Sequence, residues 1–240
     1  MPTEKTSLKL YKDTVLIDFY PTSHRYKLKG EKKWLTSVTA ATGIINKPFL
    51  IPWAVGLARD HLIEMIERGT PITHDDVRKA CDLHSVKKEE AANIGSLVHA
   101  YAERYAKTRQ LWSDEKNEKV LLGIGAFLEW VEEHDVTFLK SESLCYSKEH
   151  NFVGTFDALA EVDGKLSLVD YKTSSGIYPE YSIQASAYAL ALVEEYDLPI
   201  EQTVIVRFDK ETGKLETLEE EEFGPYQDTF LNCLALKRAL

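Results

Sequence analysis

Residues 154–173, GTFDALAEVDGKLSLVDYKT, contain two runs of alternating apolar and polar residues on either side of an Asp-Gly pair. Asp163-Gly164 between such runs is a strong signal for a two-residue type I′ turn. The stretch is therefore predicted to form a tight β-hairpin, and the prediction of the fold is built outward from it.

The turn fixes which residues of the hairpin oppose one another. If Val162 faces Lys165 across the turn, counting outward along both strands places Asp157 directly opposite Asp170. Directly opposed Cβ atoms lie ~4.5–5.5 Å apart, and like charges at that separation are destabilising. Something must offset the repulsion between these two carboxylates.

Period-two alternation places both acids on one face of the hairpin. The side chains expected on that face are those of Asp157, Leu159, Leu166, Leu168, Asp170 and Lys172. Lys172 can offset part of the repulsion, and a divalent cation bridging the two acids would offset more, because hard carboxylate oxygens suit Mg²⁺ or Mn²⁺. The alternative is an exposed hairpin whose three charges form a solvated network of little energetic weight.

Composition sets limits on the class of protein. At 240 residues and 44% hydrophobic, the chain can bury one large core, and one domain is the default. The net charge of −10 is unusual for a nucleic-acid binder, whose usual signature is basic. The three cysteines lack any CxxC spacing, which argues for a reducing compartment and against a structural zinc or an iron–sulfur cluster. No apolar run is long enough for a membrane span and no secretion signal is seen, so a cytoplasmic protein is expected.

The rest of the chain is predicted as a mixture of helices and strands. Strands are expected at 14–20, 24–30, 138–172 (three of them) and 202–209, and helices at 53–69, 73–84, 89–107, 118–134, 181–196 and 225–240. Ser37 is a plausible helix N-cap. The order of helices, β-meander and strand–helix–strand crossover predicts an α/β (α+β) fold with a central mixed β-sheet flanked by helices.

One histidine lies at the edge of the apolar stripe of the helix predicted at 89–107. His99 has Gly95 one turn before it and Glu103 one turn after it. Neutral imidazole is a good ligand for divalent metals, and Gly95 would let another chain approach the backbone closely. The second histidine of a zinc-binding HExxH motif is missing. The alternative for His99 is an ordinary polar side chain on a helix.

A second pair of polar residues follows the hairpin. Gln184 and Tyr188 are four residues apart on one face of the helix predicted at 181–196. A helix placed after a strand in this way can fold back beside the end of that strand. The alternatives are a surface amide for Gln184 and a core aromatic ring for Tyr188.

Taken in order, these residues resemble the RecB-like branch of the PD-(D/E)xK nuclease superfamily. The matching set is His99, Gly154-Thr-Phe-Asp157, Asp170-Tyr-Lys172 and Gln184-x-x-x-Tyr188. The lead-in SHRYKLKGEKKWLTSVTAATGII, followed by FLIPWA, is similar to the subfamily that contains the mitochondrial genome maintenance exonuclease. Two features depart from the branch: the third motif reads Asp-x-Lys instead of Glu-x-Lys, and the four cysteines of an iron–sulfur cluster are missing.

The resemblance implies a restriction-endonuclease-like core with an N-terminal helical elaboration. We expect residues 1–240 to form a single nuclease domain. Its expected parts are N-terminal strands and lead-in at 1–51, a helical roof at 52–135, the catalytic sheet and helix at 136–210, and a C-terminal hairpin and helix at 211–240.

The resemblance also implies metal-dependent hydrolysis of phosphodiester bonds. His99, Asp157, Asp170 and the backbone carbonyl of Tyr171 would hold Mg²⁺ or Mn²⁺, with no iron–sulfur cluster. Lys172 would orient or deprotonate the attacking water, or stabilise charge on the phosphate. Gln184 would hold Lys172 or a phosphate oxygen in place, and Tyr188 would support the same side of the active site.

DNA contacts are expected from a few further residues. Arg207, on the strand after the Gln184 helix, is the first candidate for a phosphate contact, with a structural salt bridge as the equal alternative. Ser37, Thr39, Gly95 and Trp53 are further candidates.

Similar nucleases use their extra helices to admit a single strand or a DNA end, so the resemblance favours an exonuclease acting in recombination, repair or replication. The resemblance also implies partner proteins from recombination or replication, and the sequence does not predict an oligomeric state. Three alternatives remain: an endonuclease of the same superfamily, a catalytically silent DNA-binding module, and a metal-free glycosidase that uses the paired acids.

Overall fold

The computed structural model describes residues 5–111 and 114–240. The chain forms two compact units, one made of Met1–Ile45 with Val98–Leu240 and the other of Asn46–Leu97. Each unit is described by itself.

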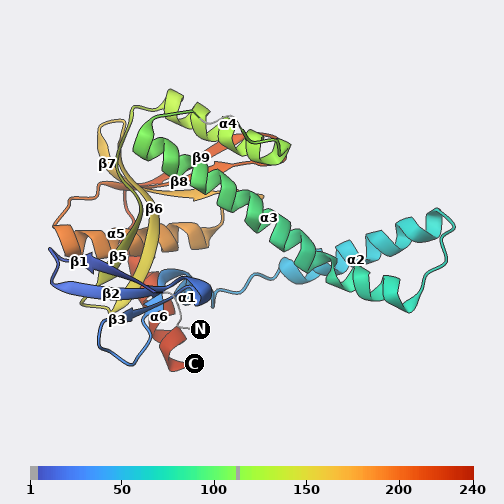
Figure 1. The fold of residues 1–240 in the computed structure, drawn as a ribbon, viewed down its shortest axis with the longest axis horizontal. Helices are drawn as coiled ribbons and strands as arrows, with labels where there is room; N and C mark the ends of the chain where they lie inside the picture. The colour runs from blue at the N-terminus through green and yellow to red at the C-terminus, as the bar shows by residue number, and fades with distance from the viewer. Residues whose placement is uncertain (1–4, 112–113) are drawn as a thin grey trace. The chain divides into compact units, whose positions relative to one another are not determined.

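A six-stranded mixed sheet lies at the centre of the larger unit (Figure 1). Its strands are β4 (Thr36–Ser37), β5 (Val136–Ser147), β6 (Phe152–Val162), β7 (Lys165–Lys172), β8 (Gln202–Phe208) and β9 (Leu215–Glu220). They follow the order β4-β6-β7-β8-β9, and β5 pairs with β6 along its other edge. The pairs β4–β6 and β7–β8 are parallel and the others are antiparallel. Helix α5 (Pro179–Tyr196) makes the expected crossover between β7 and β8.

Strands β6 and β7 form the predicted hairpin. Val162 pairs with Lys165, as expected from the turn. Asp163 and Gly164 have φ values of 51° and 81°, the left-handed backbone that a type I′ turn requires at both central positions. The Asp-Gly pair was therefore a correct guide to the turn and to the register next to it.

The hairpin ladder is shorter than the sequence suggested. It ends at the pair Ala158–Val169, so the expected direct opposition of Asp157 and Asp170 is wrong as a ladder pair. The first two residues of β6 pair with β4 on the same edge that β7 occupies further along. Strand β7 separates from β6 between these two paired segments, and the two strands part at the two acids.

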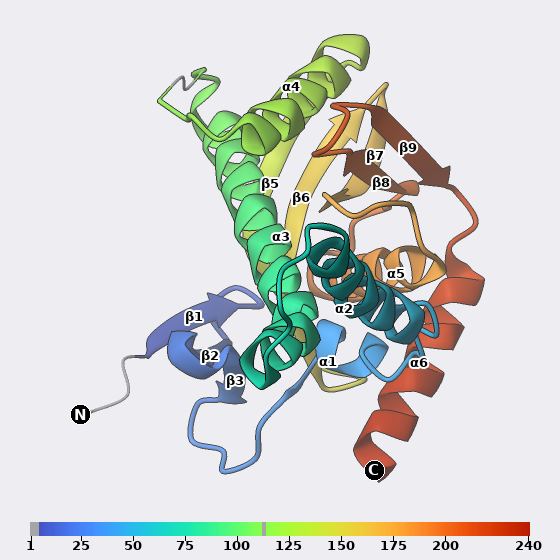
Figure 2. The same cartoon turned by 90° about the vertical axis from the view of Figure 1, so that its right-hand side faces the viewer.

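Helices cover both faces of the sheet (Figures 1 and 2). Helices α1 (Val38–Thr42), α5 and α6 (Gly224–Ala239) pack with Leu168 and Ile205 in one buried core. Helix α4 (Glu118–Glu133) lies on the opposite face, where its Phe127 ring contacts the rings of Tyr171 and Phe208. The predicted α/β class, with a central mixed sheet flanked by helices, is confirmed.

A small antiparallel sheet precedes the central one. It consists of β1 (Thr6–Leu10), β2 (Val15–Tyr20) and β3 (Arg25–Leu28), with the 3-10 helix η1 (Pro21–Ser23) between β2 and β3. Strands β2 and β3 were predicted and β1 was not. Ile17 and Tyr26 of this sheet pack on Tyr146 of β5 and Val153 of β6.

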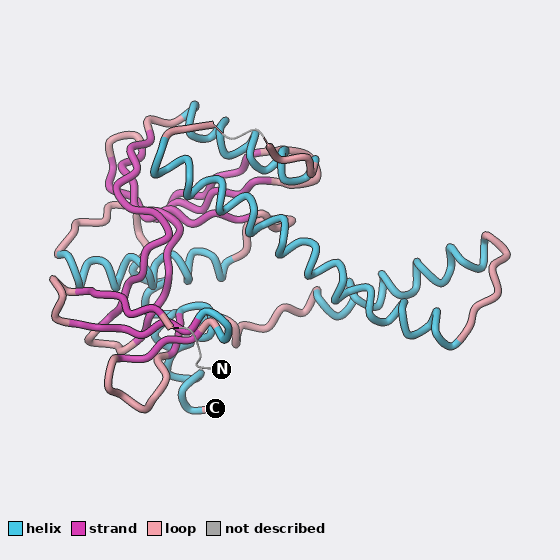
Figure 3. Tube along the Cα trace, in the orientation of Figure 1, coloured by secondary structure: helices cyan, strands magenta, loops and turns pink. Residues whose placement is uncertain are grey.

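The smaller unit is a helical pair. Helix α2 (Leu50–Glu67) ends just before Gly69, which has the left-handed φ of 69° suited to a helix terminus. Thr73 caps the start of α3 (His74–Thr108), because the amide N–H of Asp76 donates to Thr73 Oγ1. The two helices predicted at 73–84 and 89–107 are one continuous helix (Figure 3), which continues into the larger unit. The segment between them contains no proline or glycine that would stop a helix.

Within the described ranges, every helix is too short or too polar to serve as a membrane span.

Candidate active site

Two acids face each other on neighbouring strands, but not the two that the sequence suggested. Glu142 of β5 and Asp157 of β6 occupy the opposed places between the pairs Ser141–Ala158 and Ser143–Phe156. Glu142 has a φ of 45°, a left-handed conformation that is uncommon for a residue with a side chain. A cross-strand pair of carboxylates therefore exists on the β5 side of Asp157.

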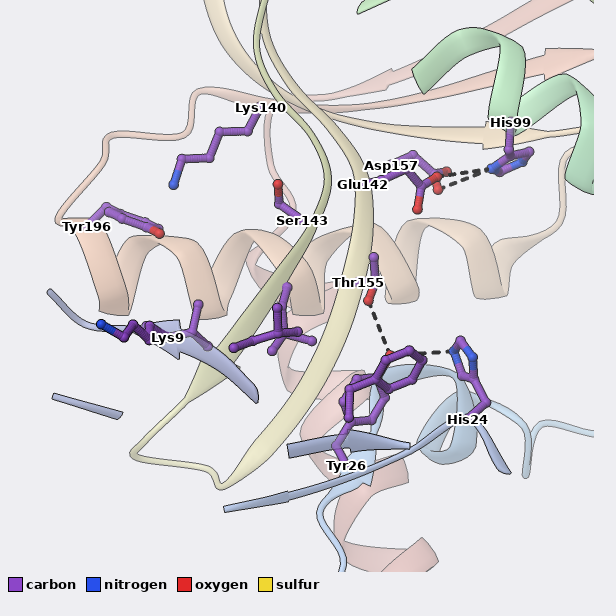
Figure 4. Close-up of a pocket in the computed structure, with 14 residues that line it drawn as sticks. Lys9, His24, Tyr26, His99, Lys140, Glu142, Ser143, Thr155, Asp157 and Tyr196 are labelled. Carbon is purple, nitrogen blue, oxygen red and sulfur yellow. Dashed lines mark hydrogen bonds and ion pairs between the residues drawn. The ribbon is translucent and has the colours of Figure 1, made fainter. Parts of the chain in front are cut away.

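His99 from α3 joins these two acids. Its Nδ1 lies 3.3 Å from Asp157 Oδ1 and 3.9 Å from Glu142 Oε1 (Figure 4). One potential ligand atom from each of the three residues lies within 4.8 Å of the others. The structure thus brings His99 and Asp157 together as predicted, and it adds Glu142.

The His99 imidazole is held by its surroundings. The edge of its ring meets the buried ring of Tyr171, with the ring centroids 5.9 Å apart. Burial by itself would lower the pKa of His99, but the nearby Asp157 and Glu142 carboxylates outweigh it and raise that pKa to about 10. The imidazole is therefore strongly coupled to the acid pair.

Asp157 also fills the gap where β6 and β7 separate. The backbone N–H of Tyr171 donates to Asp157 Oδ2 over 2.7 Å. Burial favours the neutral carboxyl, but His99, Lys172 and this N–H together hold the pKa of Asp157 below its usual value. Asp157 is a charged group that contacts β7 and α3 at once.

Asp170 and Lys172 form a second, adjoining pair on β7. Asp170 is 1% exposed, and its Oδ2 contacts Lys172 Nζ in an ion pair. Burial raises the pKa of Asp170 to about 6, with Lys172 opposing the rise and the charge of Asp157 adding to it. Apart from that ion pair, Asp170 Oδ2 accepts no hydrogen bond from the described part of the chain.

Lys172 remains charged in this setting. Burial alone would lower the pKa of Lys172, but Asp170 and Asp157 outweigh it and raise that pKa. Its Nζ also lies over the ring of Tyr181, 4.9 Å from the centroid. The ammonium is thus fixed between a carboxylate and an aromatic face of α5.

Gln184 and Tyr188 interact as their spacing predicts. Gln184 Nε2 donates to Tyr188 Oη over 3.0 Å. The Tyr188 ring packs on the backbone of Gly154, where an added Cβ would lie 2.4 Å from Tyr188 Cε1. The glycine of the Gly-Thr-Phe-Asp motif is therefore required by the close approach of this ring to β6.

Arg207 is engaged inside the protein. Its side chain is 4% exposed and pairs with Asp209 at 2.6 Å and with Glu216 at 2.5 Å. Its Nε also donates to the carbonyl of Ser174. These contacts favour the structural ion pair over the phosphate contact.

The remaining sequence candidates lie in different places. Ser37 caps α1, accepting from the amide N–H of Ala40, and Thr39 is exposed on the same helix. Gly95 and Trp53 belong to the smaller unit, where Trp53 is 40% exposed. No described contact joins these four residues to the His99 group.

The residues present suit a hard divalent cation. Even with His99 protonated, the three carboxylates Glu142, Asp157 and Asp170 exceed the two cations, His99 and Lys172, by one negative charge. Carboxylate oxygens with one imidazole nitrogen are ligands that Mn²⁺ and Mg²⁺ accept. The buried Asp170, whose Oδ2 pairs with Lys172, lies close enough to Asp157 for the two carboxylate charges to interact.

Sequence reasoning missed Glu142. It lies in the run LKSESL, which reads only as an alternating strand. Its place opposite Asp157 depends on a register shift between Phe138 and Lys140, which results from pairing with β6. The sequence signal that could have identified Glu142 is that it is an acid in the strand before the Gly-Thr-Phe-Asp motif.

The solved structures that match the chain include two of low overall likeness. An alkaline exonuclease (LHK-Exo) from Laribacter hongkongensis has a TM-score of 0.36 and 12% identity, covering 62% of this chain and 84% of its own. SSO0001 has a TM-score of 0.34 and 16% identity, covering 61% of this chain and 74% of its own. No curated protein sequence matches the chain.

The sequence itself matches a family model. Residues 107–238 match the model of the PD-(D/E)XK nuclease superfamily. That span includes Glu142, Asp157 and the Asp170–Lys172 pair, and His99 lies just before it. Because the match covers more than half of the 240 residues, the chain belongs to the PD-(D/E)XK nuclease superfamily.

Proposed function

We propose that the chain is a metal-dependent exodeoxyribonuclease that hydrolyses phosphodiester bonds in single-stranded DNA or at DNA ends. The observation that carries this proposal is the gathering of His99, Glu142 and Asp157 beside the ion-paired Asp170 and Lys172. The ordered motifs support a place in the RecB-like branch, near the subfamily of the mitochondrial genome maintenance exonuclease. A role in recombination, repair or replication goes with that placement.

The cofactor we propose is Mg²⁺ or Mn²⁺. When bound, a divalent metal lowers the pKa of a bound water and neutralises charge on the phosphoryl oxygens. His99, Glu142 and Asp157 would hold it, with Asp170 and the carbonyl of Tyr171 as the further ligands expected from the motif. The excess of carboxylates over ammonium groups supports a cation rather than an apolar ligand at this place.

The protein side chains would divide the remaining work. Lys172, held by Asp170 and the Tyr181 ring, is positioned to donate to the attacking water or to a phosphate oxygen. Gln184 donates to Tyr188 Oη, which leaves the Tyr188 hydroxyl hydrogen free to be donated toward the site.

The choice of an exonuclease rests on the resemblance and on the helical elaboration of the chain. We propose DNA, single-stranded or at its ends, as the partner, with one nuclease domain carrying the helical elaboration. A circular single-stranded substrate distinguishes this from the endonuclease alternative, because a circle offers no end.

The test is digestion of 5′- and 3′-labelled single- and double-stranded DNA, and of circular single-stranded DNA, in Mg²⁺, Mn²⁺ or EDTA. We expect metal-dependent release of short products from linear DNA and an intact circle. Cutting of the circle would establish the endonuclease instead. Hydrolysis that continues in EDTA would reject the metal, and binding without cleavage in Mn²⁺ would indicate a silent DNA-binding module.

A further inference from the structure

A pocket of about 680 Å³ opens beside the His99–Glu142–Asp157 group (Figure 4). Strands β1, β2 and β3 of the small sheet supply one wall and strands β5 and β6 supply the other. The three potential ligands lie at one end of the pocket, and Lys140 and Tyr196 lie at the other. The volume falls within the ~300–1,000 Å³ typical of sites for drug-sized ligands, which is the size class of one nucleotide.

Lys140 is the unexplained cation of this pocket. It is half-buried, and its Nζ lies 3.9 Å from the ring centroid of Tyr196. Within residues 5–111 and 114–240 no carboxylate forms an ion pair with it, whereas Lys9 in the same pocket pairs with Asp13 at 3.3 Å. The protein has a net charge of −10, yet the Lys140 ammonium in this pocket is not paired with any acid of the described residues. This ammonium is therefore available to bind an anion.

The position of Lys140 indicates what the anion is attached to. Lys140 precedes Glu142 by two residues on β5, which corresponds to roughly 6–7 Å along a strand. Both side chains line the pocket. That interval separates the backbones, whereas the side chains diverge: Lys140 extends to Tyr196 at one end of the pocket and Glu142 lies with the ligand group at the other. A nucleotide that spans the pocket would present one phosphate to the ligand group and its other phosphate to Lys140.

The other wall presents aromatic rings. Phe19 stacks on Tyr26 with the centroids 4.9 Å apart, and His24 meets the edges of both rings at 5.3 and 5.8 Å. Tyr26 Oη shares a hydrogen bond of 3.2 Å with Thr155 Oγ1, which ties the rings to the strand that carries Asp157.

His24 reaches the pocket through an uncommon backbone conformation. Its φ of 48° and ψ of 48° are left-handed, and the residue closes the 3-10 helix η1. Such conformations cost free energy and are concentrated at functional sites. The side chain is nevertheless exposed and lines the pocket rather than being buried in the core.

We propose that this pocket binds one unpaired nucleotide next to the bond that is cut, with Lys140 contacting its phosphate and Phe19 and His24 contacting its base. This deepens the proposed function and rests on it. Base stacking on aromatic side chains and a cation on the backbone are the means by which proteins bind single strands. The volume of about 680 Å³ suits one nucleotide, which favours an unpaired strand over a duplex.

The first experiment measures the salt dependence of binding. Fluorescence anisotropy with a short labelled single-stranded oligonucleotide is recorded in the non-cleaving Lys172→Ala background at several salt concentrations. Losing one phosphate contact to a single strand lowers the slope of log K against log salt by about 0.7. We expect that decrease for Lys140→Ala, an unchanged slope for Lys140→Arg, and an unchanged slope for the matched control Lys165→Ala, whose lysine is also half-buried but pairs with Glu221.

The second experiment reports on the base. Oligonucleotides carry 2-aminopurine at the 5′- or the 3′-terminal position, and its fluorescence is quenched when the base stacks. We expect quenching at one of the two ends on binding, and its loss in His24→Ala. A blunt duplex with the same probe should show no quenching beyond that of the free duplex. Circular dichroism melts of each variant establish that the fold is retained.

The outcomes separate the two proposals. If the wild-type chain cleaves DNA, but Lys140→Ala keeps the full salt slope or His24→Ala keeps the quenching, the nucleotide pocket is rejected and the nuclease stands. If the wild-type chain neither binds nor cleaves any of the DNAs in Mg²⁺ or Mn²⁺, the nuclease proposal itself fails. A lower slope together with lost quenching supports the pocket.

Discussion

Gly154→Ala tests the close packing that supports the candidate site. The added methyl would lie 2.4 Å from Tyr188 Cε1 and 3.0 Å from Val38 Cγ2. The Tyr188 ring cannot move away easily, because it is 3% exposed and its hydroxyl accepts from Gln184. The substitution therefore overpacks a buried contact.

The size of the effect follows from two opposing contributions. Overpacking of a dense core costs about 1–3 kcal/mol of the free energy of unfolding. Replacing glycine within a strand returns about 0.5–1 kcal/mol, since Gly154 has no positive φ that alanine would strain. Taken at their midpoints, the two contributions leave a net loss of about 1 kcal/mol, which for a chain of this length corresponds to a melting temperature lower by roughly 2–4 °C.

The assay is chemical and thermal unfolding followed by circular dichroism, with a matched control. Gly125→Ala makes the same chemical change in α4, where no heavy atom lies within 4 Å of the added Cβ. A helical Gly→Ala change in open space should stabilise the fold by about 0.5–1 kcal/mol. The two variants are therefore expected to shift in opposite directions.

A double-mutant cycle identifies the contact responsible. In a Tyr188→Leu background the aromatic Cε1 is gone, so the cost of Gly154→Ala should fall by about 1 kcal/mol or more, because residues in contact are not additive. If Gly154→Ala is as stable as the wild type, or costs the same in both backgrounds, the argument from ring packing is refuted.

Three further predictions concern the chemistry. Glu142→Gln should weaken Mn²⁺ binding in calorimetry because a charged ligand oxygen is lost, and an unchanged titration would remove Glu142 from the ligand set. Lys172→Ala should lower the cleavage rate by on the order of 10²-fold or more while DNA binding persists in filter assays. Retained turnover would reject its catalytic role. His99→Ala should lower metal-dependent activity by on the order of 10-fold or more, and a wild-type rate would make His99 a packing residue.

The parts of the fold that local sequence determines were predicted well. The Asp163-Gly164 turn, the crossover helix α5 and the capping of α1 by Ser37 depend on a few adjacent residues, and each is seen in the structure. The contact between Gln184 and Tyr188 is likewise set by helix periodicity. These features could be predicted because neighbouring residues decide them.

The features that depend on distant pairing could not be predicted from local patterns. Glu142 lies opposite Asp157 after a register shift in β5. The ladder that was expected to join Asp157 to Asp170 ends one pair earlier, at Ala158–Val169. The choice between a phosphate contact and an internal ion pair for Arg207 required the positions of Asp209 and Glu216. Non-local contacts of this kind are not encoded in any short window.

The hydrogen bond from Tyr171 to Asp157 affects how substitutions at position 157 should be read. The Asp157 carboxylate replaces a backbone hydrogen bond where β6 and β7 diverge. It therefore holds the two strands together in addition to its proposed role as a metal ligand. Alanine at position 157 would leave the backbone N–H of Tyr171 without a hydrogen-bond acceptor, which would lower the free energy of unfolding by about 1–3 kcal/mol. Asp157→Asn keeps one oxygen that can accept from this N–H. It therefore tests the loss of the negative charge without the loss of the hydrogen bond between the strands.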